Sequence, residues 1–385
     1  MKSFFLHLII LLGAIFALSA CNDNLDFPEA EGNVAIVYWM GDNGLSDNAQ
    51  EDINELVRGK DNIPADSKII IYADKRNTKP ITYQLDAQNG LQVWKEFTQE
   101  QDCTDSLTML NNLKEIVKAF PAKNYGLTFG AHGTGMGIKQ RRALGPDQSN
   151  KENWMNVPTL RGVLEHLPHM KYVFFDVCFM QSIEVVYELR KVTDWVIGSP
   201  AEIPAPGAPY GIITEELCKG DINGIVEKYS NYYPIGSYNG VVLSATKCSE
   251  TELENLAYST RQYIEENFAN RQTISTNDIR AIQKYSSDFS TYTYCLDINS
   301  AMARILSDED YSQWKKLFER AVPIRNAKEG RWYARACDNA TIYDEEHFGG
   351  ISMYIPLDSD EGNKKNAELK HYQWYKAAGW NKTGW

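Results

Sequence analysis

Two residues of this sequence could together perform nucleophilic chemistry, Cys178 and His132. Each follows a mainly apolar segment that is predicted to be a strand, residues 171–176 before the cysteine and residues 125–130 before the histidine. A thiolate that attacks a carbonyl group needs an accessible cysteine, a nearby imidazole and backbone N–H groups that bind the oxyanion. The two segments therefore predict a cysteine–histidine pair at the ends of two strands.

The surroundings of this pair favour the same chemistry. Cys178 precedes a predicted helix at residues 182–192, whose N-terminus would favour the thiolate. The N–H of Gly133 could bind the oxyanion, because a glycine leaves its backbone open to a substrate. Each feature alone also has an ordinary explanation, since a cysteine at a strand end is often structural and a histidine in a turn is often a polar surface residue.

The elements that must position the pair alternate between strands and helices. Apolar runs predict buried strands, and amphipathic periodicity predicts helices. This alternation predicts a mainly parallel sheet with helices on both faces, in which reactive groups gather beyond the carboxyl ends of the strands. Strands are predicted at residues 34–40, 68–74, 81–85, 91–97, 125–130, 171–176, 195–199 and 241–246, and helices at residues 47–58, 106–120, 160–167 and 182–192.

The C-terminal part of the chain has a mixed pattern rich in helices. No internal repeat or proline-rich linker divides the chain. We therefore expect an α/β core over residues 33–248 and a helical and strand extension over residues 249–385 that packs on it. Within the extension, helices are predicted at residues 250–267, 277–285, 298–306 and 311–321, and a strand at residues 350–356.

The segments around the candidate pair resemble motifs of the clostripain family of cysteine peptidases. They read Phe-Gly-Ala-His-Gly-Thr-Gly at residues 129–135 and Phe-Asp-Val-Cys-Phe-Met at residues 175–180. Residues 38–45 with 52–56 resemble the family's first strand and helix, and residues 198–202 resemble the strand end that walls the specificity pocket. The family shares a structural clan with caspases, legumains and gingipains, so the resemblance implies a caspase-like fold.

The resemblance also implies roles for the two motifs. It makes Cys178 the nucleophile and His132 the acid/base partner that protonates the leaving amine. The amides of Gly133 and Cys178 would form the oxyanion hole. The substrates would be proteins or peptides, and no cofactor would be required.

The family prefers arginine or lysine before the cut bond, because acidic residues lie at the base of its pocket. Asp176 matches one of these acids, and Ser199 and Glu202 are further substrate-binding candidates. This chain departs from the pattern at Pro206, where relatives that cut after basic residues often carry an aspartate; Glu202 could compensate. Alternatively, Asp176 orients a neighbouring loop through hydrogen bonds and Glu202 is a plain surface charge.

The polar stretch over residues 139–154 contains glycine, proline and basic residues, and we expect it to be an exposed loop. The family often matures by cutting the loop between its histidine and cysteine strands. Arg141, Arg142 and Lys151 are therefore the candidates for self-cleavage.

Metal binding has weaker support in the sequence. Some relatives need calcium, and the acidic stretches at residues 42–52 and 308–310 could bind it, but no EF-hand spacing is present and no metal ligand is assigned. The cysteines form no CxxC pair and do not cluster with histidine. Those other than Cys21 and Cys178 are expected to be buried small apolar residues, namely Cys103, Cys218, Cys248, Cys295 and Cys337.

The N-terminus resembles a bacterial lipoprotein signal peptide over residues 1–20, with a positive start and an apolar run that ends in Leu-Ser-Ala-Cys. Cys21 would become the acylated first residue, and residues 21–32 an acidic lipidated tether. The protein would then be exported and lipid-anchored in the cell envelope, at the outer membrane or cell surface, without a spanning helix. An ordinary signal peptide with a chance cysteine is the alternative.

The net charge of −12 over 385 residues argues against a nucleic-acid partner, because no basic stripe exists to neutralise phosphates. A catalytically idle surface lipoprotein that binds peptide or glycan is a second functional class, since the 9 tryptophans and 22 tyrosines would suit stacking on sugars. A glycoside hydrolase with a carboxylate pair is a third. The sequence does not indicate an oligomeric state.

Overall fold

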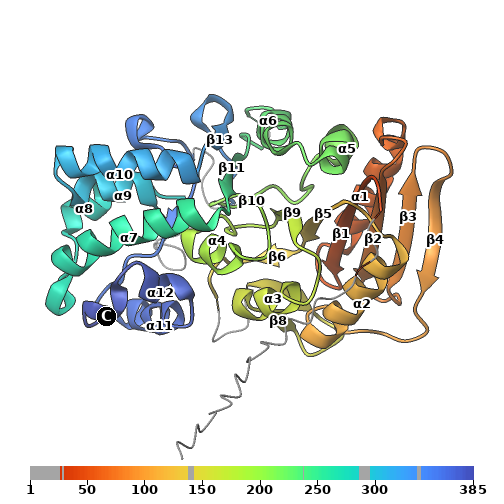
Figure 1. Cartoon of the computed structure of the whole chain (residues 1–385), viewed down its shortest axis with the longest axis horizontal. Coiled ribbons are helices and arrows are strands. Elements are labelled where there is room, and N and C mark those ends of the chain that lie inside the picture. Colours follow the sequence, from red (N-terminus) through yellow and green to blue (C-terminus); the bar gives the residue numbers. More distant parts are fainter. Residues whose placement is uncertain (1–26, 28–29, 138–142, 237, 286–294, 336–339) are drawn as a thin grey trace, which may run out of the picture.

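Apolar runs of the sequence form the parallel centre of one large sheet (Figure 1). In the computed structural model, which describes residues 27, 30–137, 143–236, 238–285, 295–335 and 340–385, this sheet has nine strands in the order β13-β11-β10-β9-β5-β1-β2-β3-β4. The parallel strands are β10 (Trp195–Gly198), β9 (Met170–Asp176), β5 (Asn124–Gly130), β1 (Asn33–Gly41) and β2 (Lys68–Lys75). Antiparallel pairing adds β3 (Ile81–Asp86) and β4 (Gly90–Glu96) at one edge, and β11 (Val242–Lys247) and β13 (Ile324–Ala327) at the other.

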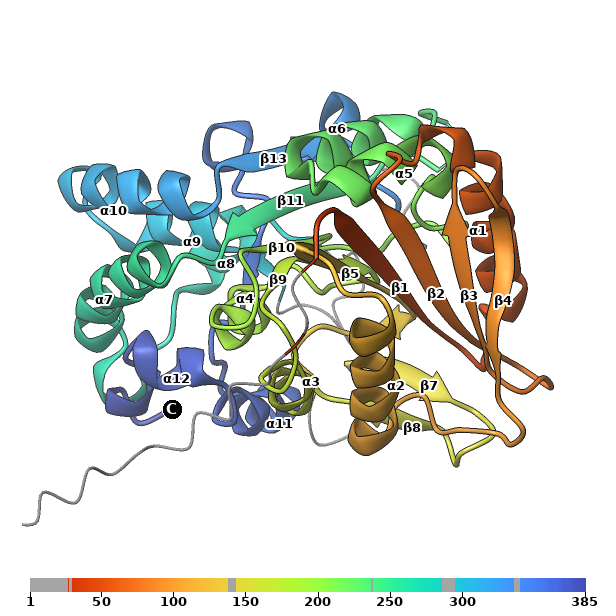
Figure 2. The same ribbon diagram turned by 45° about the vertical axis from the view of Figure 1, so that its right-hand side comes forward.

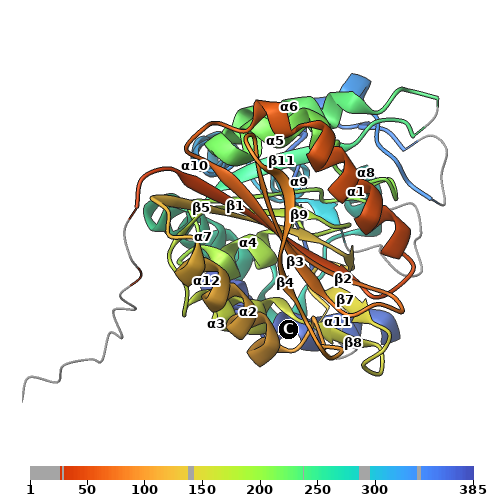
Figure 3. The same cartoon turned by 90° about the vertical axis from the view of Figure 1, so that its right-hand side faces the viewer.

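Helices cover both faces of this sheet, as Figures 2 and 3 show. The alternating side chains of β1 lie in two separate cores, Ile36 and Tyr38 on one face and Val37 and Trp39 on the other. The first face packs against α2 (Ser106–Ala119), α3 (Val157–Leu164) and α4 (Ile183–Leu189), and the second against α1 (Ser46–Arg58), α5 (Tyr210–Lys219) and α6 (Ile222–Tyr232). This arrangement confirms the predicted α/β fold with a mainly parallel sheet flanked by helices.

The C-terminal part forms a group of helices beyond α4, at the left of Figure 1. The sheet takes β13 from this part, so one strand comes from beyond the predicted boundary at residue 248. The helices are α7 (Glu250–Asn267), α8 (Thr276–Ala281), α9 (Ile298–Ile305), α10 (Asp308–Ala321), α11 (Asp360–Leu369) and α12 (Gln373–Ala377), and β12 (Leu296–Asp297) pairs with β14 (Ser352–Met353). Short 3-10 turns lie at Lys60–Asn62, Ala269–Arg271, Lys328–Gly330, Glu345–His347 and Trp380–Lys382.

The stretch of chain between β5 and α3 forms a second, small sheet. It consists of β6 (His132–Gly133), β7 (Leu144–Asp147) and β8 (Asn153–Met155). The prediction of an exposed loop over residues 139–154 is therefore wrong for residues 143–147, whereas Gln148, Ser149, Lys151 and Glu152 do lie in an exposed turn. Ala143 and Leu144 are buried in the main core, and β7 pairs with strands on both sides, so the glycine and proline at residues 145 and 146 lie inside a packed strand.

Candidate active site

Cys178 lies just beyond the carboxyl end of β9, in the turn that leads to α4. The next residue, Phe179, has a φ of 64°, a left-handed conformation that is uncommon for a bulky side chain. Its N–H donates to the Ala201 carbonyl at 2.9 Å, and the N–H of Gln181 donates to the Ser199 carbonyl at 3.0 Å. These bonds, together with the buried ring of Phe179, hold the sharp turn that presents Cys178.

The thiol of Cys178 is half-buried and contacts the segment that follows β10. The N–H of Ile203 donates to Sγ at 3.4 Å, and the Ile203 carbonyl lies 3.9 Å from Sγ. Burial, with the nearby carboxylates of Glu202 and Asp176, raises the pKa of Cys178 to about 12. The expectation that a helix N-terminus favours the thiolate is wrong for this conformation, because α4 begins only at Ile183 and burial prevails.

His132 belongs to β6, where it pairs with Gly145 of β7. Its imidazole is exposed at the surface, and the protein around it lowers its pKa below the ordinary value through partial desolvation. An imidazole with a lowered pKa is neutral at pH 7 and can accept a proton. A Cβ added to Gly44, in the segment after β1, would lie 3.8 Å from His132 Nε2.

Gly133 brings the histidine segment against the cysteine segment. A Cβ at this position would collide with Cγ1 of Val177 and would lie 3.0 Å from the carbonyl oxygen of Cys178. No larger residue fits there without displacing one of the two strand ends. The ends of β5 and β9 are therefore in direct contact, because these strands are neighbours in the sheet.

Asp176 is the last residue of β9, and its buried carboxylate points into the core that contains α5 and α6. It accepts hydrogen bonds from the Ala208 N–H at 2.9 Å, the Tyr210 hydroxyl at 3.2 Å and the Tyr229 hydroxyl at 3.0 Å. Burial raises the pKa of Asp176 to about 6, although these hydrogen bonds oppose the rise. The carboxylate thus holds the segment after β10 beside Cys178.

A second buried acid, Asp52 of α1, lies near Asp176. It is 2% exposed, and its Oδ2 has no hydrogen-bond partner. Burial, followed by repulsion from Asp176 and from Glu55, raises the pKa of Asp52 to about 10. Sequence reasoning placed Asp52 only in an acidic stretch that could bind calcium and gave it no role in substrate binding, although a signal was available. The buried positions of α1 are Ala49, Asp52, Ile53 and Leu56, so an acid stands on the apolar face of the helix.

The other predicted substrate-binding residues lie in the segment after β10. Ser199 is buried, and its Oγ accepts the Ala201 N–H at 3.1 Å, so it shapes the turn. Glu202 is half-buried close to the Cys178 thiol and accepts the N–H of Arg335 at 2.7 Å. Pro206 is exposed.

The family comparison decides the identity of this chain. A family model described as the clostripain family, peptidase family C11, matches residues 37–385. The chain belongs to the clostripain family. It is therefore a cysteine peptidase, a hydrolase that acts on peptide or protein substrates.

Solved structures of clostripain-family proteins share the fold. A secreted C11 cysteine protease from Bacteroides thetaiotaomicron, solved with an irreversible peptide inhibitor, is 27% identical with a TM-score of 0.77 over 91% of this chain and 99% of that chain. A cysteine protease from B. fragilis is 28% identical with a TM-score of 0.53, over 60% of this chain and 96% of that chain. An inactive zymogen from Parabacteroides distasonis is 24% identical with a TM-score of 0.74 over 91% and 99%, a likeness of fold alone. The comparison with curated proteins found no match.

In this clostripain-family chain, the C-terminal part also reaches the site, which sequence reasoning missed. Trp332 packs in one cluster with Ala201, next to the segment that contacts the thiol. Burial raises the pKa of Tyr333, and negative charges on the nearby Glu202 and Cys178 raise it further. No local pattern marks these residues, because they approach the site only through the tertiary fold.

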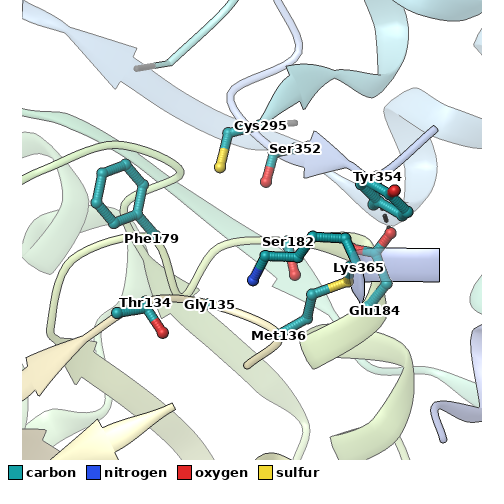
Figure 4. A pocket seen from close by; sticks show the side chains of 10 residues that line it. All are labelled: Thr134, Gly135, Met136, Phe179, Ser182, Glu184, Cys295, Ser352, Tyr354 and Lys365. Carbon is teal, nitrogen blue, oxygen red and sulfur yellow. Dashed lines mark hydrogen bonds between the residues drawn. The ribbon is translucent and has the colours of Figure 1, made fainter. Parts of the chain in front are cut away.

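A pocket lies beside the turn that carries Cys178, on the Phe179 side (Figure 4). It contains the Cys295 thiol and Glu184, whose Oε1 accepts the Tyr354 N–H at 2.8 Å and whose Oε2 has no hydrogen-bond partner. Burial raises the pKa of Glu184 to about 7. The lining residues are Thr134, Gly135, Met136, Phe179, Ser182, Glu184, Cys295, Ser352, Tyr354 and Lys365, without Cys178 or His132.

The remaining predicted positions are only partly described. Cys21, Arg141, Arg142 and Cys337 lie outside the described residues. Lys151 is exposed in the turn between β7 and β8, with a φ of 63°. The predicted burial is confirmed for Cys103, Cys218 and Cys248, whereas Cys295 is half-buried because it borders the pocket. Among the helices of the described residues, none combines the length and apolar character needed to cross a membrane.

Proposed function

We propose that this protein is an endopeptidase in which Cys178 attacks the scissile carbonyl and His132 is the acid/base partner. The close packing at Gly133, where an added Cβ would lie 3.0 Å from the Cys178 carbonyl oxygen, carries the proposal, because it shows that the histidine and cysteine segments lie against each other. His132 takes the thiol proton, and the thiolate forms a bond to the carbonyl carbon. The amides of Gly133 and Cys178 bind the resulting oxyanion. His132 then gives its proton to the leaving amine, and water hydrolyses the thioester.

The proposed substrates carry arginine or lysine before the cut bond. Asp52 and Asp176 are buried behind the cysteine turn, and among the described residues neither forms an ion pair with a lysine or arginine. A basic side chain would relieve the electrostatic cost of these acids. Glu202 adds a carboxylate beside the thiol. These three acids would compensate for Pro206, which stands where relatives carry an aspartate.

Fluorogenic peptides that differ only in the residue before the cut bond test this function. We expect cleavage after arginine and lysine, and none by the Cys178→Ala or His132→Ala variants. Asp176→Asn should lower kcat/KM for arginine peptides about tenfold to a hundredfold, as expected for loss of a charge-assisted hydrogen bond. Cleavage after uncharged residues only would contradict the specificity, and activity in Cys178→Ala would contradict the mechanism.

The proposed maturation cut lies at Arg141 or Arg142. Lys151 is less suited, because its turn is held by hydrogen bonds from Ser149 and Asn150 to Asp42 and Asp147, whereas a protease needs an extended segment. The intact mass of purified protein should show one cut that is absent in Cys178→Ala. An Arg141→Ala/Arg142→Ala double variant that is still cut at residue 151 would reverse the assignment.

The N-terminal segment supports export and a lipid anchor at Cys21. Mass spectrometry of the N-terminal peptide from the native host should find acyl chains on Cys21, and Cys21→Ala should release the enzyme from the membrane fraction. An unmodified mature N-terminus would instead support the alternative, an ordinary signal peptide with a chance cysteine.

A further inference from the structure

The pocket of Figure 4 lies on the opposite face of the sheet from Asp176, which is proposed to bind arginine. The carboxylate of Asp176 contacts Tyr210 and Tyr229, in the core that contains α5 and α6. Met136 and Tyr354 of the pocket belong to the other core, with α2, α3 and α4. An extended peptide that crosses this edge of the sheet, with its arginine on the Asp176 side, places the residues after the cut bond on the side of the pocket.

The pocket begins one residue beyond the proposed nucleophile. Phe179, which directly follows Cys178, lines it, and a Cβ added to Gly135 would lie 2.8 Å from the Phe179 carbonyl oxygen. The N–H of Ser352 donates to the Gln181 carbonyl at 3.0 Å, which attaches the C-terminal part to the same turn. The first residue after the cut bond is therefore the one that lies nearest to this pocket.

The pocket has room for the end of one side chain. Its volume is about 40 Å³, whereas a single water molecule needs about 10–15 Å³. A few non-hydrogen atoms therefore fit, but an aromatic ring or a stretch of backbone does not. Phe179 and Met136 supply apolar walls, and the side chain of Lys365 is 28% exposed, so the pocket can be entered from solvent beside it.

One polar atom of the pocket lacks a partner. Glu184 is 0% exposed, and its Oε1 accepts the Tyr354 N–H at 2.8 Å, but among the described residues its Oε2 has no hydrogen-bond partner. Such an atom costs folding stability, and a ligand that pairs with it recovers the loss. Burial raises the pKa of Glu184 to about 7, so both its protonated and its ionised form occur at neutral pH. A primary amide suits both forms, because its N–H donates to a carboxylate and its C=O accepts from a carboxylic O–H.

Charged side chains are disfavoured in this pocket. Burial raises the pKa of Cys295, in the pocket wall, to about 12, while the positive charge of Lys365 lowers it and the negative charge of Glu184 raises it. Charges of both signs therefore act inside the pocket. A lysine or arginine of the substrate would be repelled by Lys365, and an aspartate or glutamate would be repelled by Glu184.

We propose that this pocket binds the side chain of a glutamine that directly follows the cut bond of the substrate. Glutamine combines an apolar stem, which suits the walls formed by Phe179 and Met136, with a primary amide that reaches Glu184 Oε2. The inference rests on the proposed peptidase function and extends it to the leaving side of the site. The preferred substrates then carry arginine or lysine followed by glutamine.

Internally quenched peptides that contain one arginine and differ only in the next residue test the pocket. We expect kcat/KM about tenfold higher with glutamine than with alanine, as for one hydrogen bond to a charged group, and lower values with lysine, glutamate and phenylalanine than with glutamine. Cleavage after arginine at equal rates for all these residues would overturn the inference and leave the proposed function intact. No cleavage of any peptide would instead contradict the proposed function, and binding would then decide the role of the pocket.

A change of Glu184 should alter the preference for the residue after the cut. Glu184→Met keeps the length of the side chain and removes its polar end, so the ratio of kcat/KM between the glutamine and methionine peptides should fall about tenfold. This ratio compares two substrates of one enzyme, so a partly unfolded preparation does not affect it. Glu216→Met is the matched control, because Glu216 of α5 is also buried with an unpartnered Oε2 but belongs to a helix on the opposite face. Equal ratios in the parent and in Glu184→Met would contradict the proposal.

Binding can be measured without catalysis on the Cys178→Ala chain. Calorimetric titration should show about tenfold tighter binding of the arginine–glutamine peptide than of the arginine–alanine peptide. The Cys178→Ala/Glu184→Met double variant should bind both peptides equally. Equal affinity of the two peptides for the Cys178→Ala chain, or no binding of either, would overturn the proposal.

Discussion

At the scale of single residues, the site depends on a close backbone approach at Gly133. This glycine lies between Val177 and the Cys178 carbonyl, where any side chain would force two strand ends apart. The adjacent acids act differently, because Asp176 is fully hydrogen-bonded whereas Asp52 is buried with an unpartnered oxygen. Asp176 therefore positions the segment after β10, whereas Asp52 is buried at a cost in folding stability.

Gly133→Ala should lower kcat/KM about a hundredfold or more, because the added Cβ displaces the proposed oxyanion donor. Steady-state kinetics on an arginine peptide measure the loss. Gly162→Ala is a matched control, since a Cβ there meets nothing within 4 Å. Equal activity of Gly133→Ala and Gly162→Ala would show that the contact does not position the site.

Asp52→Asn should stabilise the fold increasingly as the pH rises. The pKa of Asp52 is raised from 3.8 to about 10 in the folded state, so the folded chain retains a proton that the unfolded chain loses above about pH 4. Stability of the parent therefore falls between about pH 4 and pH 10, by at most about 1.4 kcal/mol per pH unit for this group. Asparagine does not titrate, so the difference in stability should grow from pH 5 to pH 8.

Urea unfolding at pH 5, 6.5 and 8 measures this difference, with the exposed Asp61→Asn as control. The same Asp52→Asn variant should cleave arginine peptides more slowly. A variant that is less stable at every pH would assign Asp52 a purely structural role.

At the scale of elements, the segment after β10 contacts Cys178, the proposed nucleophile. Its Ile203 N–H contacts the thiol, its Glu202 carboxylate lies nearby, and Arg335 from the C-terminal part holds Glu202 through a backbone hydrogen bond. The thiol is protonated at neutral pH in this arrangement. A shift of this segment would expose the thiol and lower its pKa.

Glu202→Gln should lower the pKa of Cys178, because it removes a negative charge that favours the protonated thiol. Iodoacetamide alkylation of Cys178 can be followed by peptide mass spectrometry between pH 7 and pH 10. In Glu202→Gln, the alkylation rate should begin to increase at a lower pH than in the parent. Glu250→Gln, whose side chain is 63% exposed on α7, is the control. An alkylation profile unchanged from the parent would exclude this electrostatic influence.

At the scale of the whole molecule, the C-terminal part and the parallel sheet share one core. The same apolar cluster contains β-strand residues such as Phe129, α4 residues such as Tyr187, and Trp374 of α12. Trp374 is 0% exposed, and its ring packs against Tyr187 with centroids 5.4 Å apart. The peptidase site therefore depends on the folding of residues far beyond its motifs.

Trp374→Ala should destabilise the entire protein by about 3–5 kcal/mol, the usual cost of a large cavity in a core. Activity and far-ultraviolet circular dichroism should be lost together at a lower urea concentration than in the parent. Tyr258→Ala, at a side chain 62% exposed on α7, should leave the midpoint unchanged. Activity that persists at urea concentrations above a first unfolding transition would indicate two independently folding units.

The sequence by itself determined every strand of the large sheet except β13, most helices, and the placement of Cys178 and His132 at strand ends. Apolar runs and amphipathic periods are local, and parallel strands place their carboxyl ends at one edge. Boundaries were less well predicted where packing decides them, as at α8, which ends at Ala281 instead of residue 285.

Only the tertiary structure decided which polar groups are buried and what they contact. It made β5 and β9 neighbours, packed β7 against β6, and gathered Asp42, Asp74, Glu100 and Asp147 from four segments. It also placed Tyr229 on Asp176 and Ile203 on the thiol. The reason is physical: these contacts join residues far apart in the chain, and no local pattern records the partner that desolvates or satisfies a polar atom.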